Sequence, residues 1–183
     1  MLFRSLAHGR PSIETLRELL PNGDYRAENR IVEQGEIDDL EGVVAMPGAL
    51  ALLTSLPPAQ WAVVTSCTRP LAEARWGASG LPRPRQWITS SDIVHGKPAP
   101  DAYLAGAALL GLSPGDCLVF EDAPAGVRAG KAAGCRVVAF TTMATPATLR
   151  EAGADWITTG CSALRLVSSS PRLELSLNAA AAE

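Results

Sequence analysis

Residues Cys117-Leu118-Val119-Phe120-Glu121-Asp122-Ala123-Pro124-Ala125-Gly126 form an apolar run that ends in two adjacent carboxylates and a glycine-containing turn. Upstream, His95-Gly96-Lys97-Pro98-Ala99-Pro100 places a lysine on a loop rich in proline and glycine. Carboxylates bind a hard cation such as Mg²⁺ through oxygen, and a lysine ammonium neutralises phosphate charge. Together, the two segments predict a Mg²⁺-dependent site for phosphoryl transfer.

Short apolar segments alternate with helical segments along most of the chain. This alternation is typical of right-handed βαβ units, so we expect an α/β fold built on a parallel sheet. Strands are predicted over 61–65, 86–89, 117–120, 136–140 and 156–158. Helices are predicted over 12–20, 25–40, 49–56, 70–78, 99–110, 123–133, 145–152 and 162–167.

The chain divides near residues 43–48 into a polar, helical N-terminal part and the alternating part. About 40 residues of this kind cannot bury a core alone, so the N-terminal part must pack on something else. After Val167 the sequence predicts a frayed tail. We therefore expect a small helical unit over 1–44, an α/β core over 45–167 and a flexible tail over 168–183.

Polar side chains follow several of the predicted strands. Thr65 and Ser66 end one strand, Glu121 and Asp122 end another, and Lys97 lies in the loop that follows a third. Ligands of open parallel sheets bind outside the carboxyl ends of the strands. The pattern therefore gathers the hydroxyls, the lysine and the carboxylates on one rim of the sheet.

Composition argues against two classes of partner. With a net charge of −3, the chain gives no reason to expect nucleic acid or an anionic membrane surface as a partner. No apolar run approaches the roughly 20 residues that a membrane-spanning helix needs. None of the four cysteines forms a C-x-x-C pair, and we interpret them as small buried thiols in a reducing cytoplasm.

Three ordered motifs resemble those of the haloacid dehalogenase-like hydrolases, and among them the capped sugar-phosphate phosphatases and the β-phosphoglucomutases. Val63-Val64-Thr65-Ser66 resembles the second motif of that family. Lys97 within Gly-Lys-Pro-Ala-Pro matches the third, and Val119-Phe120-Glu121-Asp122-Ala123 with Gly126 and Gly134 matches the fourth. The resemblance implies a Rossmann-like core, with the N-terminal unit as a partial helical cap.

The resemblance also implies a role for each matching core residue. Thr65 supplies a hydroxyl, and Ser66 a backbone N–H, to a phosphoryl oxygen. Lys97 orients the nucleophile and offsets phosphate charge. Glu121 and Asp122 bind the Mg²⁺ cofactor.

A second loop resembles the part of the cap that closes over the substrate. It reads His8-Gly9-Arg10-Pro11-Ser12, so Arg10 and Ser12 are expected to contact the substrate. The expected partner is a small phosphorylated sugar or polyol. The oligomeric state is left open.

The chain departs from the family at the first motif, an apolar strand ending in Asp-x-Asp-x-Thr ahead of the cap. The first aspartate of that motif is the nucleophile and the second is the general acid/base. The closest segment here, Asp39-Leu40-Glu41-Gly42, follows a polar helix, and we interpret it as a coincidence. We therefore expect the chain to be N-terminally truncated relative to the family, and inactive or nearly so.

The absent strand is a central one in the family. It lies between the strand ending at Thr65 and the strand ending at Glu121. Without it, those two strands keep unpaired backbone groups, which are costly when buried. We expect a marginally stable chain, a rearranged sheet or a fragment of a longer product.

Other interpretations remain open. A phosphosugar mutase of the β-phosphoglucomutase type shares every motif visible in this chain. A non-catalytic binding or regulatory protein would keep the phosphate pocket without turnover. Assembly with a separately encoded first strand is a further possibility.

Overall fold

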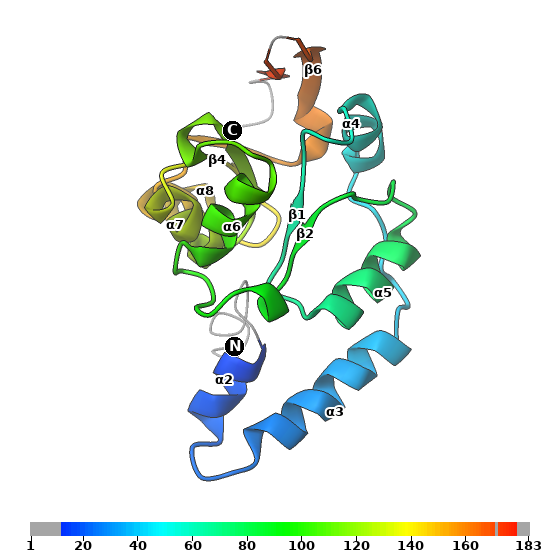
Figure 1. Cartoon of the computed structure of the whole chain (residues 1–183), viewed down its shortest axis with the longest axis vertical. Helices are drawn as coiled ribbons and strands as arrows, with labels where there is room; N and C mark the ends of the chain where they lie inside the picture. Colours follow the sequence, from blue (N-terminus) through cyan, green and yellow to red (C-terminus); the bar gives the residue numbers. More distant parts are fainter. Residues whose placement is uncertain (1–11, 171, 179–183) are drawn as a thin grey trace.

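The computed structural model describes residues 12–170 and 172–178, and it confirms an α/β fold with parallel strands (Figure 1). The helices are α2 (Ser12–Leu19), α3 (Tyr25–Asp38), α4 (Ala49–Ser55), α5 (Arg69–Ser79), α6 (Asp101–Leu109), α7 (Pro124–Ala132) and α8 (Pro146–Glu151). Short 3-10 turns are η1 (Ser90–Asp92), η2 (Pro114–Asp116) and η3 (Cys161–Ala163). The strands are β1 (Val63–Val64), β2 (Trp87–Ile88), β3 (Leu118–Glu121), β4 (Arg136–Phe140), β5 (Trp156–Thr158), β6 (Leu164–Ser168) and β7 (Glu174–Leu177).

The parallel strands form two separate sheets. β1 pairs with β2, and β3, β4 and β5 pair in that order. Within residues 12–170 and 172–178, no strand joins β1 to β3, so each has one strand neighbour. The strands ending near Thr65 and Glu121 are therefore not paired with each other in this part of the chain, which does not show the rearranged sheet that was one of the expected outcomes.

Apolar packing on both faces connects the two sheets. On one face, Val64 of β1 and Tyr103 of α6 join the cluster that holds Val119 and Val137. On the other face, Trp61, just before β1, packs in the same cluster as Phe120 of β3. Burial of this apolar surface holds the sheets in a common core without backbone hydrogen bonds between β1 and β3.

Helices α2 and α3 form a hairpin at one end of the long axis of the molecule (Figure 1). Asp24 begins α3 by accepting a 2.9 Å hydrogen bond from the Ala27 N–H, as N-cap aspartates do. Glu36 of α3 forms a 3.0 Å ion pair with Arg75 of α5. The hairpin thus packs on α5 of the core, as the sequence requires.

The C-terminal part corrects two predictions. The segment 162–167 was expected to be a short helix, and 168–183 a flexible tail, of which the structure describes 168–170 and 172–178. Instead, β6 and β7 form an antiparallel hairpin, in which Leu164 faces Leu177 and Leu166 faces Leu175. These leucines alternate with polar residues and pack against Leu52 and Leu56 in the cluster that also holds Phe120, so burial selects strands here.

Within the described part of the chain, no helix combines the length and the apolar character needed to cross a membrane.

Candidate active site

The predicted site residues lie where parallel strands end. Thr65 directly follows β1, Glu121 is the last residue of β3, and Asp122 comes next. Lys97 lies in the loop that leads into α6. Although Lys97 and Glu121 are far apart in sequence, their side chains meet.

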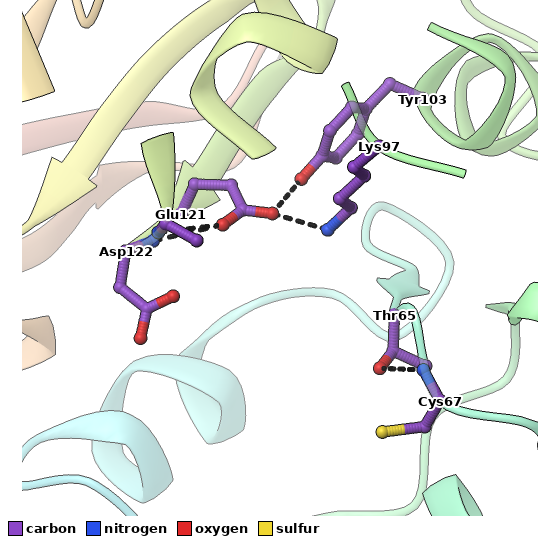
Figure 2. Close-up of polar contacts among 7 residues, drawn as sticks. Thr65, Cys67, Lys97, Tyr103, Glu121 and Asp122 are labelled. Atoms are coloured by element: carbon purple, nitrogen blue, oxygen red, sulfur yellow. Dashed lines mark hydrogen bonds and ion pairs between the residues drawn. The ribbon is translucent and has the colours of Figure 1, made fainter. Parts of the chain in front are cut away.

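Glu121 is the centre of a buried polar cluster (Figure 2). Its Oε1 accepts a hydrogen bond from Lys97 Nζ and a 2.5 Å hydrogen bond from the Tyr103 hydroxyl. Its Oε2 accepts hydrogen bonds from the backbone N–H groups of Asp122, at 3.1 Å, and Ala123, at 3.3 Å. Lys97, Tyr103 and Glu121 are only 5%, 7% and 9% exposed, so these contacts replace their water.

These contacts set the ionisation of the cluster. Burial raises the pKa of Glu121, but the charge of Lys97 and the hydrogen bonds from Lys97, Tyr103 and Ala123 outweigh it and hold that pKa below its usual value. Burial and the Glu121 charge raise the pKa of Tyr103 well above its usual value. The cluster is therefore a carboxylate held by an ammonium and a protonated phenol.

Asp122 has a different environment from Glu121. Figure 2 shows its carboxylate turned away from Lys97 and Tyr103. Asp122 Oδ2 accepts a 3.0 Å hydrogen bond from the Thr142 hydroxyl, which lies in the loop after β4. Asp122 is half-buried and offers its oxygens at the rim.

The turn after β1 carries the predicted phosphate-binding hydroxyls. Thr65 Oγ1 accepts a 3.2 Å hydrogen bond from the Cys67 N–H, and Ser66 lies between them in the same half-buried turn. Thr68, the N-cap of α5, donates its hydroxyl hydrogen bond to Glu33 of α3. This contact ties the hairpin of α2 and α3 to the turn that holds Thr65.

Two contacts between His95 and Asp101 join the two ends of the loop that carries Lys97. His95 donates its backbone N–H to Asp101 Oδ1 at 3.2 Å, and its ring Nδ1 lies 2.9 Å from the same oxygen. Hydrogen bonds from His95 lower the pKa of Asp101. Because Asp101 begins α6, the contact couples the loop to the helix that carries Tyr103.

The two residues predicted to contact the substrate from the cap are Arg10 and Ser12, and no contact of Ser12 with the Glu121 cluster is seen in the described residues. The Ser12 hydroxyl donates a 2.7 Å hydrogen bond to Asn29 Oδ1, within the hairpin of α2 and α3. Asn29 is itself buried. Arg10 lies outside the described residues. The substrate contacts of Arg10 and Ser12 therefore stay predictions.

Sequence reasoning did not find Tyr103 or Thr142. Tyr103 had one signal, because it is a single polar aromatic among alanine, leucine and glycine in α6, where a buried hydroxyl needs a partner. Thr142 lies in an ordinary Thr-Thr loop and has no distinguishing pattern. Both residues are recognised as part of the site only from their hydrogen bonds, which Tyr103 donates to Glu121 and Thr142 to Asp122.

One of the two predicted metal ligands, Asp122, fits a cation that keeps several water ligands. Within residues 12–170 and 172–178, no group of three His, Cys, Asp or Glu side chains is arranged to hold a metal ion. Mg²⁺ is usually held by one or two carboxylates together with water and substrate phosphate. Asp122 meets that requirement, whereas both oxygens of Glu121 already accept hydrogen bonds from the protein.

Comparisons with known proteins show which family the chain is similar to. The sequence model of the haloacid dehalogenase-like hydrolases matches residues 5–134. The chain is 46% identical over 149 residues to hexitol phosphatase A of Escherichia coli, covering 79% of this chain and 69% of that protein. It is 36% identical over 174 residues to glycerol-1-phosphate phosphohydrolase 1 of Saccharomyces cerevisiae, covering 88% and 69%. The β-phosphoglucomutase of Clostridium difficile shares the fold, with a TM-score of 0.76 at 16% identity, over 89% of this chain and 77% of that one.

Proposed function

Because the chain belongs to the haloacid dehalogenase-like hydrolase family, we propose that it carries the phosphate-binding part of a phosphatase for small phosphorylated polyols or sugars. One observation carries the proposal. The buried ammonium of Lys97 is held at the strand-end rim that also bears Thr65 and Asp122. A positive charge and hydroxyl donors at such a rim suit a phosphate group.

Each residue has a task in this proposal. Thr65 and Ser66 bind phosphoryl oxygens, and Lys97 offsets the charge of the phosphate. Hydrolases of this family generally use a divalent metal, usually Mg²⁺. Asp122 is the side chain that would hold it, and the bound ion would polarise the phosphoryl oxygens. Arg10 and Ser12 contact the rest of the substrate.

The relatives favour a phosphatase over a mutase. Hexitol phosphatase A and glycerol-1-phosphate phosphohydrolase 1 are more than 30% identical to this chain, whereas the C. difficile mutase supports only the fold. The four cysteines are all free thiols, which fits a reducing cytoplasm. The expected burial holds only for Cys135, whereas Cys67, Cys117 and Cys161 are half-buried. We propose no nucleic acid or membrane partner.

Residues 1–183 alone are proposed to bind phosphate with little turnover, because no aspartate has been identified for the nucleophile. No strand of the described residues covers the free edges of β1 and β3, which leaves a place for one more parallel strand. A peptide with an apolar strand ending in Asp-x-Asp-x-Thr, added in trans, would bring a nucleophile beside Lys97.

The test measures inorganic phosphate binding by calorimetry, and phosphate release from a hexitol phosphate, glycerol 1-phosphate and β-glucose 1-phosphate, with Mg²⁺ and with a chelator. We expect binding that Lys97→Ala removes and Lys131→Ala keeps, and release only with the added peptide. Lys131 is a matched control because it pairs with Asp155 away from the rim.

Three results would contradict parts of the proposal. Failure of the chain to bind phosphate excludes the phosphate site itself. Metal-dependent release without the peptide shows that another carboxylate serves as nucleophile. Conversion of β-glucose 1-phosphate into an isomeric phosphate, without phosphate release, identifies a mutase.

A further inference from the structure

The Tyr103 hydroxyl contacts the Lys97–Glu121 pair, and the space that the ring fills does not explain why a hydroxyl is present. Its hydroxyl lies 2.5 Å from Glu121 Oε1, the same oxygen that Lys97 Nζ contacts. Lys97 Nζ also lies 5.0 Å from the centroid of the Tyr103 ring, within the range of a cation–π contact. Phenylalanine would fill the same space, but among the described side chains it would leave Glu121 Oε1 with Lys97 as its one donor.

The carboxylate of Glu121 is fully used by the protein. Each oxygen accepts two hydrogen bonds, from Lys97 and Tyr103 at Oε1 and from the N–H groups of Asp122 and Ala123 at Oε2. A carboxylate has about four acceptor positions. Glu121 is therefore satisfied without a cation, and its contacts fix the position of the lysine.

We propose that Tyr103 is a positioning residue, whose hydroxyl shares Glu121 Oε1 with Lys97 and thereby holds the Lys97 ammonium in place for a phosphate oxygen. The inference rests on the proposed function, because it assigns Lys97 to phosphate. It also assigns Glu121 to anchoring Lys97, and it leaves Asp122 as the carboxylate for a cation.

The physical reason is competition for one oxygen. An ammonium has three hydrogens to donate. When the phenol donates to Glu121 Oε1, that oxygen needs fewer hydrogen bonds from Lys97. The Lys97 ammonium then has hydrogens left to donate to a bound phosphate. Without the phenol, the buried carboxylate depends more strongly on Lys97. More of the ammonium hydrogens are then committed to Glu121, and the affinity for phosphate falls.

The chain is well suited to the test, because its lysines are Lys97 and Lys131 and its tyrosines are Tyr25 and Tyr103. Protein labelled with ¹⁵N-lysine gives one side-chain signal from each lysine, with Lys131 as the internal reference. Tyr103→Phe removes only the hydroxyl. Tyr25→Phe is the matched control, because the Tyr25 ring lies beside Arg17 and Arg26 in the hairpin of α2 and α3.

We expect Tyr103→Phe to shift the Lys97 ammonium signal, to leave that of Lys131 unchanged, and to weaken metal-free binding of inorganic phosphate by about tenfold, as expected for loss of one hydrogen bond to a charged group. Tyr25→Phe should match the wild type in both measurements. Glu121→Gln is the second variant, and it should also shift the Lys97 signal and weaken phosphate binding.

A purely structural role for Tyr103 would lower the unfolding midpoint of Tyr103→Phe without moving the Lys97 signal or the phosphate affinity, and that result would overturn the proposal. A shifted Lys97 signal with unchanged phosphate affinity would overturn it as well. If the wild type binds no phosphate, the proposed function fails, and the Lys97 signal alone then decides whether Tyr103 positions the lysine.

Discussion

Gly126 lies so close to Glu121 that a Cβ atom at position 126 would stand 2.0 Å from Glu121 Oε1. Gly126 is in the first turn of α7, which begins directly after the carboxylates. The side chain of Glu121 occupies the space that a side chain at 126 would take. A side chain at 126 would therefore force the Glu121 carboxylate out of its present position, independently of any positive φ.

Gly126→Ala should displace the Glu121 carboxylate from Lys97 and Tyr103. The expected loss is about 1–3 kcal/mol of unfolding free energy, together with weaker phosphate binding, because overpacking forces neighbours to move. Urea denaturation and calorimetry measure the two effects. Gly77→Ala is the control, since nothing lies within 4 Å of its added Cβ in α5, and it should stabilise the protein by about 0.5–1 kcal/mol. Wild-type behaviour of Gly126→Ala would contradict the packing argument.

Asp155 should make stability depend on acid pH. Burial raises its pKa, but hydrogen bonds from Lys131 and from the Val137 N–H outweigh burial and lower the pKa below its usual value. A lowered folded-state pKa means stability that is present above the unfolded-state pKa and is lost as pH falls through the folded-state pKa. Unfolding free energy should therefore fall below about pH 4, the usual aspartate pKa.

Asp155→Asn should be less stable at pH 7 by about 1–2 kcal/mol and should lose less stability on acidification than the wild type. Urea midpoints between pH 3 and pH 7 measure both effects. Asp116→Asn, in the exposed turn before β3, controls for the loss of one negative charge. Equal pH dependence in Asp155→Asn and the wild type would show that Asp155 does not carry this effect.

The hairpin of β6 and β7 should contribute to global stability. Leu164 is 2% exposed and packs with Leu52 and Leu56, so Leu164→Ala should cost about 2–5 kcal/mol. Val167→Ala on the same strand changes a residue that is 64% exposed, and it should stay within about 0.5 kcal/mol of the wild type. Thermal and urea unfolding measure the stability of the two variants against the wild type. A small effect of Leu164→Ala would mean that the hairpin is detached from the core in solution.

Neighbouring amides of β1 should exchange with solvent at different rates. The Val63 N–H donates to Gln86 O, just before β2, at 3.0 Å, and the Thr65 N–H donates to Ile88 O of β2 at 2.9 Å. Alternation along a strand turns the Val64 N–H toward the open edge. Native-state hydrogen exchange should protect Val63 and Thr65 more than Val64. Equal protection of all three would show that another strand covers the edge.

Local patterns were enough to predict most of the fold. Arg136–Phe140 and Trp156–Thr158 were predicted with the bounds that the structure has, because apolar runs between turn residues mark buried strands. The meeting of Lys97 and Glu121 was predicted as a shared rim, since carboxyl ends of parallel strands gather at one edge. The hairpin of β6 and β7 was missed, although its leucines alternate, because its short strands are stabilised by contacts with α4.

The sequence alone therefore determined the order of strands and helices as far as Thr158, the family, and the residue types at the rim, because these depend on short-range periodicity and on motifs of adjacent residues. The tertiary structure decided how the carboxylates are used. Glu121 points with Val119 toward α6, where Tyr103 and Lys97 hold it, while Asp122 turns to Thr142. These partners come from distant segments, and which carboxylate each one reaches depends on how the helices pack on the strands.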